Sequence, residues 1–182
     1  MIKIKVFPDN WMKFFARVIL TFLLWQYVIA LVFSSVDVHG ILLRNVYAKD
    51  SYINLINMGD PGHNLTTRFA LYDFNRRVPT NIVPYGGTRP VNIYPLKGVV
   101  KIIHPSALGV AYPGLNSCDI YMNMEELTNY KIFKNTLVHE YLHCLGYNHV
   151  DNPNDLMYYV DTDHDDSEIT KWAKKIEEEI FK

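Results

Sequence analysis

Three histidines near residue 140 have the side-chain type and the spacing needed to hold a metal ion. His139 and His143 are four positions apart, so on a helix their rings lie one turn above each other on the same face. Gly146 allows the helix to end, because glycine tolerates the left-handed cap conformation, and the chain can then turn back to bring in His149. Three imidazole ligands leave one position open, which is typical of a catalytic rather than a structural Zn²⁺ site.

Glu140 directly follows the first of these histidines, where a carboxylate can act as a base on a zinc-bound water. The run therefore fills five positions of the pattern H-E-x-x-H-x-x-G-x-x-H. Met157 lies eight residues after His149 and is followed by Tyr158 and Tyr159. The alternatives to a catalytic centre are ordinary surface or core histidines, and a zinc site without catalysis.

On these residues the chain resembles the metzincin zinc endopeptidases. The resemblance implies that the three histidines bind one catalytic Zn²⁺, that Glu140 is the general base and that Met157 forms the Met-turn. Tyr159 is similar to an astacin-type tyrosine that can reach the zinc and stabilise the oxyanion; the alternative is a tyrosine that only packs. Tyr158 is matrixin-like, and Val150 matches no usual subfamily residue, so the subfamily stays unassigned.

Segments 108–113 and 118–123 are also similar to matrixins. In that subfamily both segments are strands, and the resemblance implies that the later one, near Ile120, is the sheet edge that pairs with an extended substrate. The fold class expected is α+β, a small metzincin-like domain with a twisted mixed sheet, an active-site helix, a Met-turn and a C-terminal helix, after an N-terminal hydrophobic helix.

The function expected is hydrolysis of peptide bonds in a peptide or protein substrate. Two other classes remain open: a non-catalytic, zinc-stabilised binding module at a membrane, and a hydrolase of a non-peptide amide. Retention of Glu140 argues against the binding module, because a structural zinc site does not need that residue. A net charge of −1 over 182 residues gives no basic surplus for nucleic acid, and nothing indicates an oligomeric state.

The N-terminus is basic and is followed by an uncharged apolar run over residues 18–33. Such a run is typical of a signal peptide or a signal-anchor helix, with a buried core helix as the alternative. The positive-inside rule leaves the N-terminus in the cytoplasm and sends the rest across. We therefore expect a targeting segment at 1–36 and an extracytoplasmic protease domain at 37–182, which is secreted, or held in the membrane through residues 14–36 if uncleaved.

Cys118 and Cys144 are the two cysteines, too few for a disulfide framework. Small buried hydrophobes are the interpretation favoured here, and a disulfide in an exported domain is the alternative. The acidic run 161–166 does not fit an EF-hand, because its sixth position is not glycine. A looser second metal site using His63, His104 or His164 is a lesser alternative to solvated loop residues.

The remaining pattern predicts elements of mixed type. Residues 50–56 are interpreted as a short helix, residues 65–72 as a strand by their alternation, and the apolar runs 91–94 and 99–103 as strands. The active-site helix should begin at Thr128 or Asn129, which are good caps. A last helix should follow Asp165 and Glu168, a capping box, with an apolar stripe facing the core: Ile169, Trp172, Ala173, Ile176 and Ile180.

Overall fold

The computed structural model of the chain describes residues 14–15, 17–27, 38–47, 51–55, 61–77, 88–159 and 164–180. They belong to two compact units, Met1–Val38 and His39–Lys182. In the first unit, residues 17–27 are helical and their apolar side chains are exposed. No helix in the described ranges is long and apolar enough to cross a membrane. Residues 1–13, 16 and 28–36 of the predicted targeting segment lie outside these ranges.

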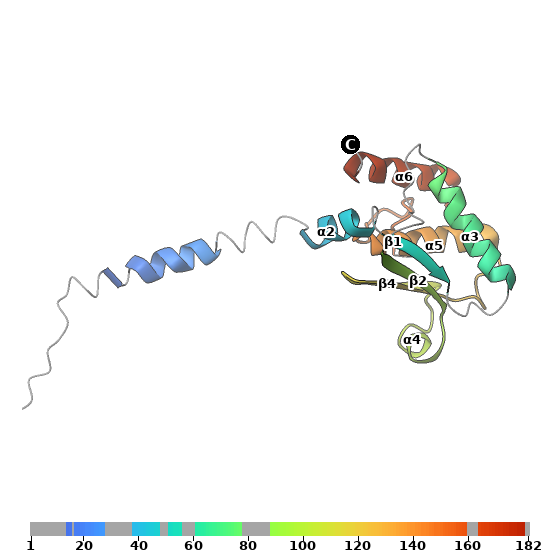
Figure 1. Ribbon diagram of the computed structural model, residues 1–182, viewed down its shortest axis with the longest axis horizontal. Helices are drawn as coiled ribbons and strands as arrows, with labels where there is room; N and C mark the ends of the chain where they lie inside the picture. Colours follow the sequence, from blue (N-terminus) through green and yellow to red (C-terminus); the bar gives the residue numbers. More distant parts are fainter. Residues whose placement is uncertain are drawn as a thin grey trace, which may run out of the picture. The chain divides into compact units, whose positions relative to one another are not determined.

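The second unit is built on a four-stranded sheet of order β1-β2-β4-β3 (Figure 1). β1 (Ser51–Leu55), β2 (Arg89–Pro95) and β4 (Cys118–Met122) are parallel, and β3 (Gly109–Pro113) pairs antiparallel with β4. β4 is therefore paired on both sides. The prediction that the segment near Ile120 is the substrate-pairing edge is wrong, because β3 occupies that edge.

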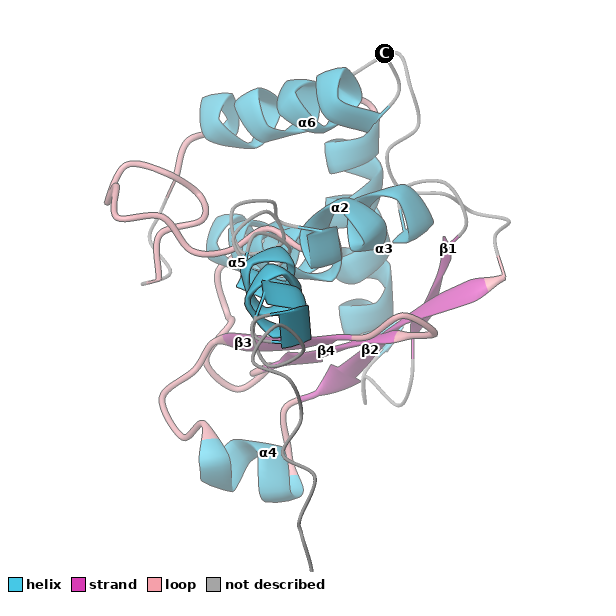
Figure 2. Cartoon of the chain, turned by 90° about the vertical axis from the view of Figure 1, so that its left-hand side faces the viewer, coloured by secondary structure: helices cyan, strands magenta, loops and turns pink. Residues whose placement is uncertain are grey.

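The long helices cover one face of this sheet (Figure 2). They are α2 (Val38–Tyr47), α3 (Pro61–Asn75), α5 (Tyr130–Cys144) and α6 (Asp166–Ile180). Alternate residues of the strands point to them: Cys118, Ile120 and Met122 of β4 and Val91 and Ile93 of β2 are fully buried. The short helix α4 (Gly98–Ile103) lies on the opposite side of the sheet (Figure 2). The architecture is thus α+β with a mixed sheet, as expected.

Two predicted strands and one predicted helix are wrong in type. Residues 51–55 form β1 rather than a helix, because they find a parallel partner in β2. Residues 65–72 lie within α3, where Thr67, Ala70, Leu71 and Phe74 are buried at helical spacing. Residues 99–103 belong to α4. The predicted strands at 91–94, 108–113 and 118–123 are confirmed within a residue or two.

The ends of the predicted active-site helix are confirmed. The Asn129 side chain caps α5 by accepting hydrogen bonds from the backbone N–H groups of Lys131, at 2.8 Å, and Ile132, at 3.4 Å; such a cap contributes about 1 kcal/mol. The helix ends at Cys144, and Gly146 follows with a φ of 79°. In α6, all five residues of the predicted apolar stripe are buried.

A buried ionic network joins α3, α5 and α6. Lys134 Nζ lies 2.6 Å from Asp166 and 3.2 Å from Asp73, and Arg77 contacts both carboxylates. Burial alone would raise the pKa of Asp73, but the hydrogen bonds from Arg77, Arg76 and Lys134 lower it to about 2. Burying the charge of Lys134 would destabilise the fold if the lysine were not paired. The pairing therefore requires α3, α5 and α6 to keep their relative positions.

A disulfide joins the sheet to the end of α5. Cys118 of β4 and Cys144 are bonded, with their Cα atoms 5.7 Å apart. The interpretation of these residues as unpaired hydrophobes is therefore wrong: both are fully buried, but packing of α5 on the sheet brings them within bonding distance. Disulfides persist mainly outside the cytoplasm, so the bond suggests an extracytoplasmic location.

Reducing this bond should destabilise the fold without destroying it. Its two cysteines are separated by 26 positions in the sequence, and in the chain-entropy model such a cross-link contributes about 3.5 kcal/mol to the free energy of unfolding. Urea unfolding with and without dithiothreitol should show this loss for the wild type. The Cys118→Ser/Cys144→Ser double variant should start at the reduced value and not respond to the reductant. A wild type that reacts with a thiol reagent while folded would contradict the assignment.

Candidate metal centre

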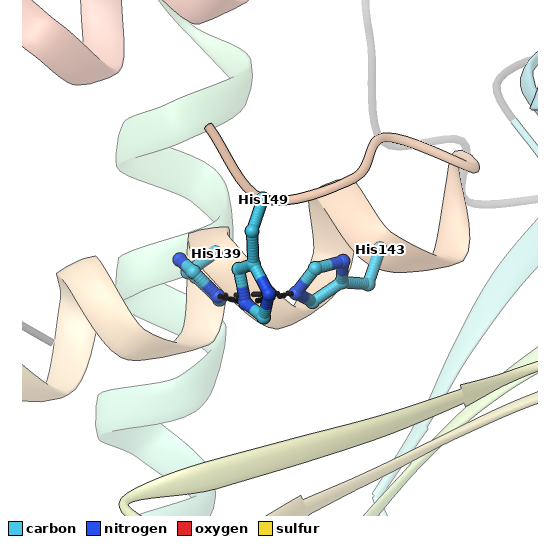
Figure 3. Close-up of side chains that lie close together, drawn as sticks. All are labelled: His139, His143 and His149. Carbon is cyan, nitrogen blue, oxygen red and sulfur yellow. Dashed lines mark hydrogen bonds between the residues drawn. The ribbon is translucent and has the colours of Figure 1, made fainter. Parts of the chain in front are cut away.

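Three imidazole rings converge beside the C-terminal half of α5 (Figure 3). His139 and His143 project from one face of the helix, and His149 reaches them from the segment after it. Their Nε2 atoms form a nearly equilateral triangle, with separations of 3.1 Å from His143 to each of the other two and 3.2 Å between His139 and His149. The structure thus brings together the three histidines predicted from the sequence.

Backbone carbonyls fix which nitrogen of two of these rings carries the proton. His139 Nδ1 lies 2.7 Å from the carbonyl oxygen of Leu156, and His143 Nδ1 lies 2.8 Å from that of Tyr147. A carbonyl oxygen only accepts, so each Nδ1–H must donate, and each neutral ring presents an unprotonated Nε2. The Nε2 atoms of His139 and His143 are 3.1 Å apart. Because neither carries a proton, they cannot hydrogen-bond to each other. They repel unless a cation lies between them.

Burial keeps these rings ready to bind a metal. His139 is 5% exposed, and burial lowers the pKa of His139 to about 4 and that of His143 to about 4. Metal ligation needs the neutral imidazole, and both rings are therefore in the binding form at neutral pH. His149 is more exposed and lies toward the solvent side of the cluster.

The donor set fits a tetrahedral metal ion. Zn–N bonds of about 2.0–2.1 Å at tetrahedral angles separate ligand nitrogens by about 3.3 Å, close to the 3.1 and 3.2 Å observed. Imidazole ligands suit zinc, copper, iron and nickel rather than magnesium or calcium. The cluster could therefore hold a metal ion.

The metal centre opens into a cavity of about 810 Å³. The opposite wall is made by the end of α4, the connection to β3 and the first residues of that strand. Glu140 and Tyr159, the two residues predicted to act beside the metal, both line this cavity together with the three histidines. All five predicted site residues thus border one space.

Glu140 is held tightly against the edge strand. Its side chain is buried, and a Cβ placed on Gly109 of β3 would lie 2.7 Å from both Cγ and Oε1 of Glu140 and 2.8 Å from a methyl of Thr136. Carbon atoms cannot approach so closely, so only glycine allows β3 to come this near to α5. Gly109 therefore sets the narrow spacing between the carboxylate and the sheet edge. This role of Gly109 could not be predicted, because a glycine in a strand has no local signature that shows how closely a distant helix approaches it.

Tyr159 borders the cavity in an exposed position. Its side chain is 63% exposed, and its hydroxyl oxygen accepts a hydrogen bond of 3.1 Å from the hydroxyl of Tyr158. The two rings also contact each other, with centroids 4.3 Å apart. An exposed side chain of this kind has room to change rotamer toward or away from the histidines.

The segment that supplies the Leu156 carbonyl is fixed by α6. The Asp155 carboxylate accepts hydrogen bonds from the Met157 backbone N–H, at 2.9 Å, and from Trp172 Nε1, at 2.8 Å. Met157 is fully buried, and its carbonyl accepts from the Val150 N–H directly after His149. This positioning role of Asp155 could not be predicted from the local sequence, because its partner Trp172 lies 17 residues further along the chain.

The second metal site that was the lesser alternative for His63, His104 or His164 is not seen in the part of the chain that the structure describes. There, the three-histidine cluster is the one group of three or more histidine, cysteine or acidic side chains with converging ligand atoms. His104 lies 3.1 Å from the Tyr112 hydroxyl, and the carbonyl of the buried His164 accepts from Asn135. Residues 161–163 of the acidic run lie outside the described residues.

Comparisons with known proteins do not place the chain in a family. No family model matches it, and no curated protein is similar enough to match. The interpretation of the site therefore depends on its motif and its geometry. These support a small α+β domain with a metal-binding cluster of three histidines.

Proposed function

We propose that the chain is a zinc-dependent endopeptidase of the metzincin type. The observation that carries this proposal is the convergence of three Nε2 atoms, two of which are held unprotonated by backbone carbonyls, in one cavity with a buried glutamate. A structural zinc site needs four protein ligands and no free carboxylate. The cavity and Glu140 favour catalysis over a structural site.

The reaction divides between the metal and Glu140. A bound Zn²⁺ would supply a Lewis acid and a water of lowered pKa. Glu140 would act as the base that accepts a proton from the water attacking the scissile carbonyl, and would then deliver that proton to the leaving amine. Its burial and its contact with Gly109 hold the carboxylate in place during both transfers. Tyr159 donates a hydrogen bond to the oxyanion after its hydroxyl leaves Tyr158.

The substrate is an extended peptide that adds to the sheet at β3. This strand is the outer strand next to the metal cavity, and its residues Gly109, Val110 and Ala111 line that cavity. Pairing with an edge strand uses main-chain hydrogen bonds, which any peptide can make. This proposal replaces the expected pairing near Ile120 and explains how a broad range of sequences could be accepted.

Removing one histidine should remove the metal. We expect the purified wild type to contain close to one zinc ion per chain by elemental analysis, and His143→Ala to lose most of it, because two ligands with an exposed His149 hold zinc weakly. His63→Ala is the matched control, since His63 lies on α3 outside the cluster. Full zinc retention by His143→Ala, with a native circular dichroism spectrum, would disprove the ligand assignment.

Removing the carboxylate should remove hydrolysis and leave the metal. Glu140→Gln preserves the packing against Gly109, so zinc content and melting temperature should stay close to wild type. Cleavage of a broad peptide library, followed by mass spectrometry, should slow by about 10²- to 10⁴-fold. Glu126→Gln, at an exposed position, is the control and should cleave normally.

The same digest separates the two alternative functions. A wild type that binds zinc but cleaves no peptide in the library would indicate the binding module. Hydrolysis of simple amides without hydrolysis of peptides would indicate the non-peptide amidase. Either result would overturn the proposed peptidase activity and leave the zinc assignment intact.

Tyr159→Phe should lower kcat by about 10²- to 10³-fold, because it removes one donor to the oxyanion. KM and melting temperature should change little, since the ring stays and the side chain is 63% exposed. Tyr158→Phe is the matched control: it removes the neighbouring hydroxyl and the hydrogen bond between the two tyrosines, and kcat should stay within a few-fold of wild type. An unchanged kcat in Tyr159→Phe would mean that this tyrosine only packs.

A further inference from the structure

Helix α4 exposes an apolar face to solvent. None of its residues is buried, and Val99, Ile102 and Ile103 are 69%, 78% and 61% exposed. These positions follow the spacing i, i+3, i+4, so on a helix the three side chains share one face. Isolated exposed apolar residues are common on protein surfaces, but three on one turn and a half of helix form a continuous patch.

The backbone holds α4 away from the core. Gly98 begins the helix with a φ of 60°, a conformation that other residues rarely adopt, and the space around its Cα is open. The helix closes with a hydrogen bond of 2.9 Å from the His104 N–H to the Val100 carbonyl. α4 lies on the side of the sheet opposite to the four long helices (Figure 2), and its apolar face is exposed among the residues that the structure describes.

The charges around this patch have one sign. Lys97 precedes the helix and Lys101 lies within it, while residues 96–118 contain no aspartate or glutamate. Among the residues that the structure describes, neither lysine has an ion-pair partner. Lys101 lies about 200° around the helix from Val99, on the side away from the apolar face, and Lys97 precedes the helix. An apolar face on a segment with only positive charge is complementary to a surface that is apolar within and negatively charged outside.

We propose that α4 is a lipid-contacting element that inserts Val99, Ile102 and Ile103 into the interface of an anionic membrane. The positive charges of Lys97 and Lys101 attract the anionic headgroups and favour approach of α4 to the lipid surface. Interfacial helices of this type combine a buried apolar face with basic residues at the headgroup level. The proposal concerns α4 alone and does not depend on the N-terminal segment or on peptidase activity.

Contact with lipid at α4 would orient the metal cavity. Ile103 belongs to the exposed apolar face of α4 and also lines the cavity that contains the three histidines. A membrane held against α4 therefore lies beside the opening of that cavity. Peptide segments close to the membrane surface would be the ones that reach the centre.

A label on α4 tests this proposal in the full chain. Both native cysteines are in the disulfide, so the Ile102→Cys variant can be labelled at a single site with an environment-sensitive fluorophore. Vesicles of phosphatidylcholine with phosphatidylglycerol should shift its emission to the blue, and phosphatidylcholine alone should not. The same label on Lys174→Cys, at an exposed position of α6, should stay in water with both vesicles.

Replacing Lys97 and Lys101 by glutamate tests how much their charges contribute to vesicle binding, with the apolar face left intact. Lys97→Glu/Lys101→Glu in the labelled chain should raise the vesicle concentration needed for half of the shift by about tenfold or more. Val99→Cys, labelled in the same way, repeats the test at a second exposed position. Circular dichroism of each variant checks that the fold is kept.

Three results would overturn the proposal. The first is a label that stays in water while the protein sediments with the vesicles, which would mean that the N-terminal segment alone binds lipid. The second is an equal shift with neutral vesicles, which would exclude an anionic surface as the determinant. The third is a shift without vesicles that grows with protein concentration, which would mean that a second copy of the chain covers α4.

Discussion

The hydrogen bonds from His139 and His143 to two backbone carbonyls are the interactions on which the metal centre depends. They place the proton of each ring on Nδ1 and leave both Nε2 lone pairs pointing at the same point in space. A metal ion would relieve that repulsion, so the folded chain presents a cluster that could hold a cation. Both carbonyls belong to residues after α5, Tyr147 and Leu156. The centre therefore exists only when this following segment is fixed.

Helix α6 fixes that segment at two points. Trp172 donates to Asp155, whose carboxylate also accepts the Met157 N–H, and the hydroxyl of Tyr147 donates to Glu179 at 2.6 Å. Burial is the main reason that the pKa of Tyr147 is raised, and the bond to Glu179 adds to it, so the phenol remains a donor. The C-terminal helix thus acts on the metal centre without touching the ligands, by holding the carbonyls that orient them.

The sequence predicted the centre better than the fold around it. The spacing of His139, His143 and His149 is local, and one helix followed by a glycine turn is enough to bring the rings together. β1 and α3 were misread because their type depends on distant partners: β1 pairs with β2, and α3 packs on α5, where Phe74 contacts Tyr141. The disulfide is of the same kind, since no pattern in one chain shows that β4 will lie beneath the end of α5.

One face of helix α5 carries His139 and His143, and a neighbouring face of the same turns contacts the sheet. Successive residues on a helix point about 100° apart, so Cys144 bonds to the sheet while its neighbour His143 faces the metal centre. One turn earlier, Glu140 contacts the edge strand at Gly109, next to His139. Each ligand on the helix therefore has an adjacent residue fixed to the sheet. A shift of α5 along its axis would break the disulfide or force Glu140 into β3, which is why the distance between the metal centre and the edge strand is set by the fold.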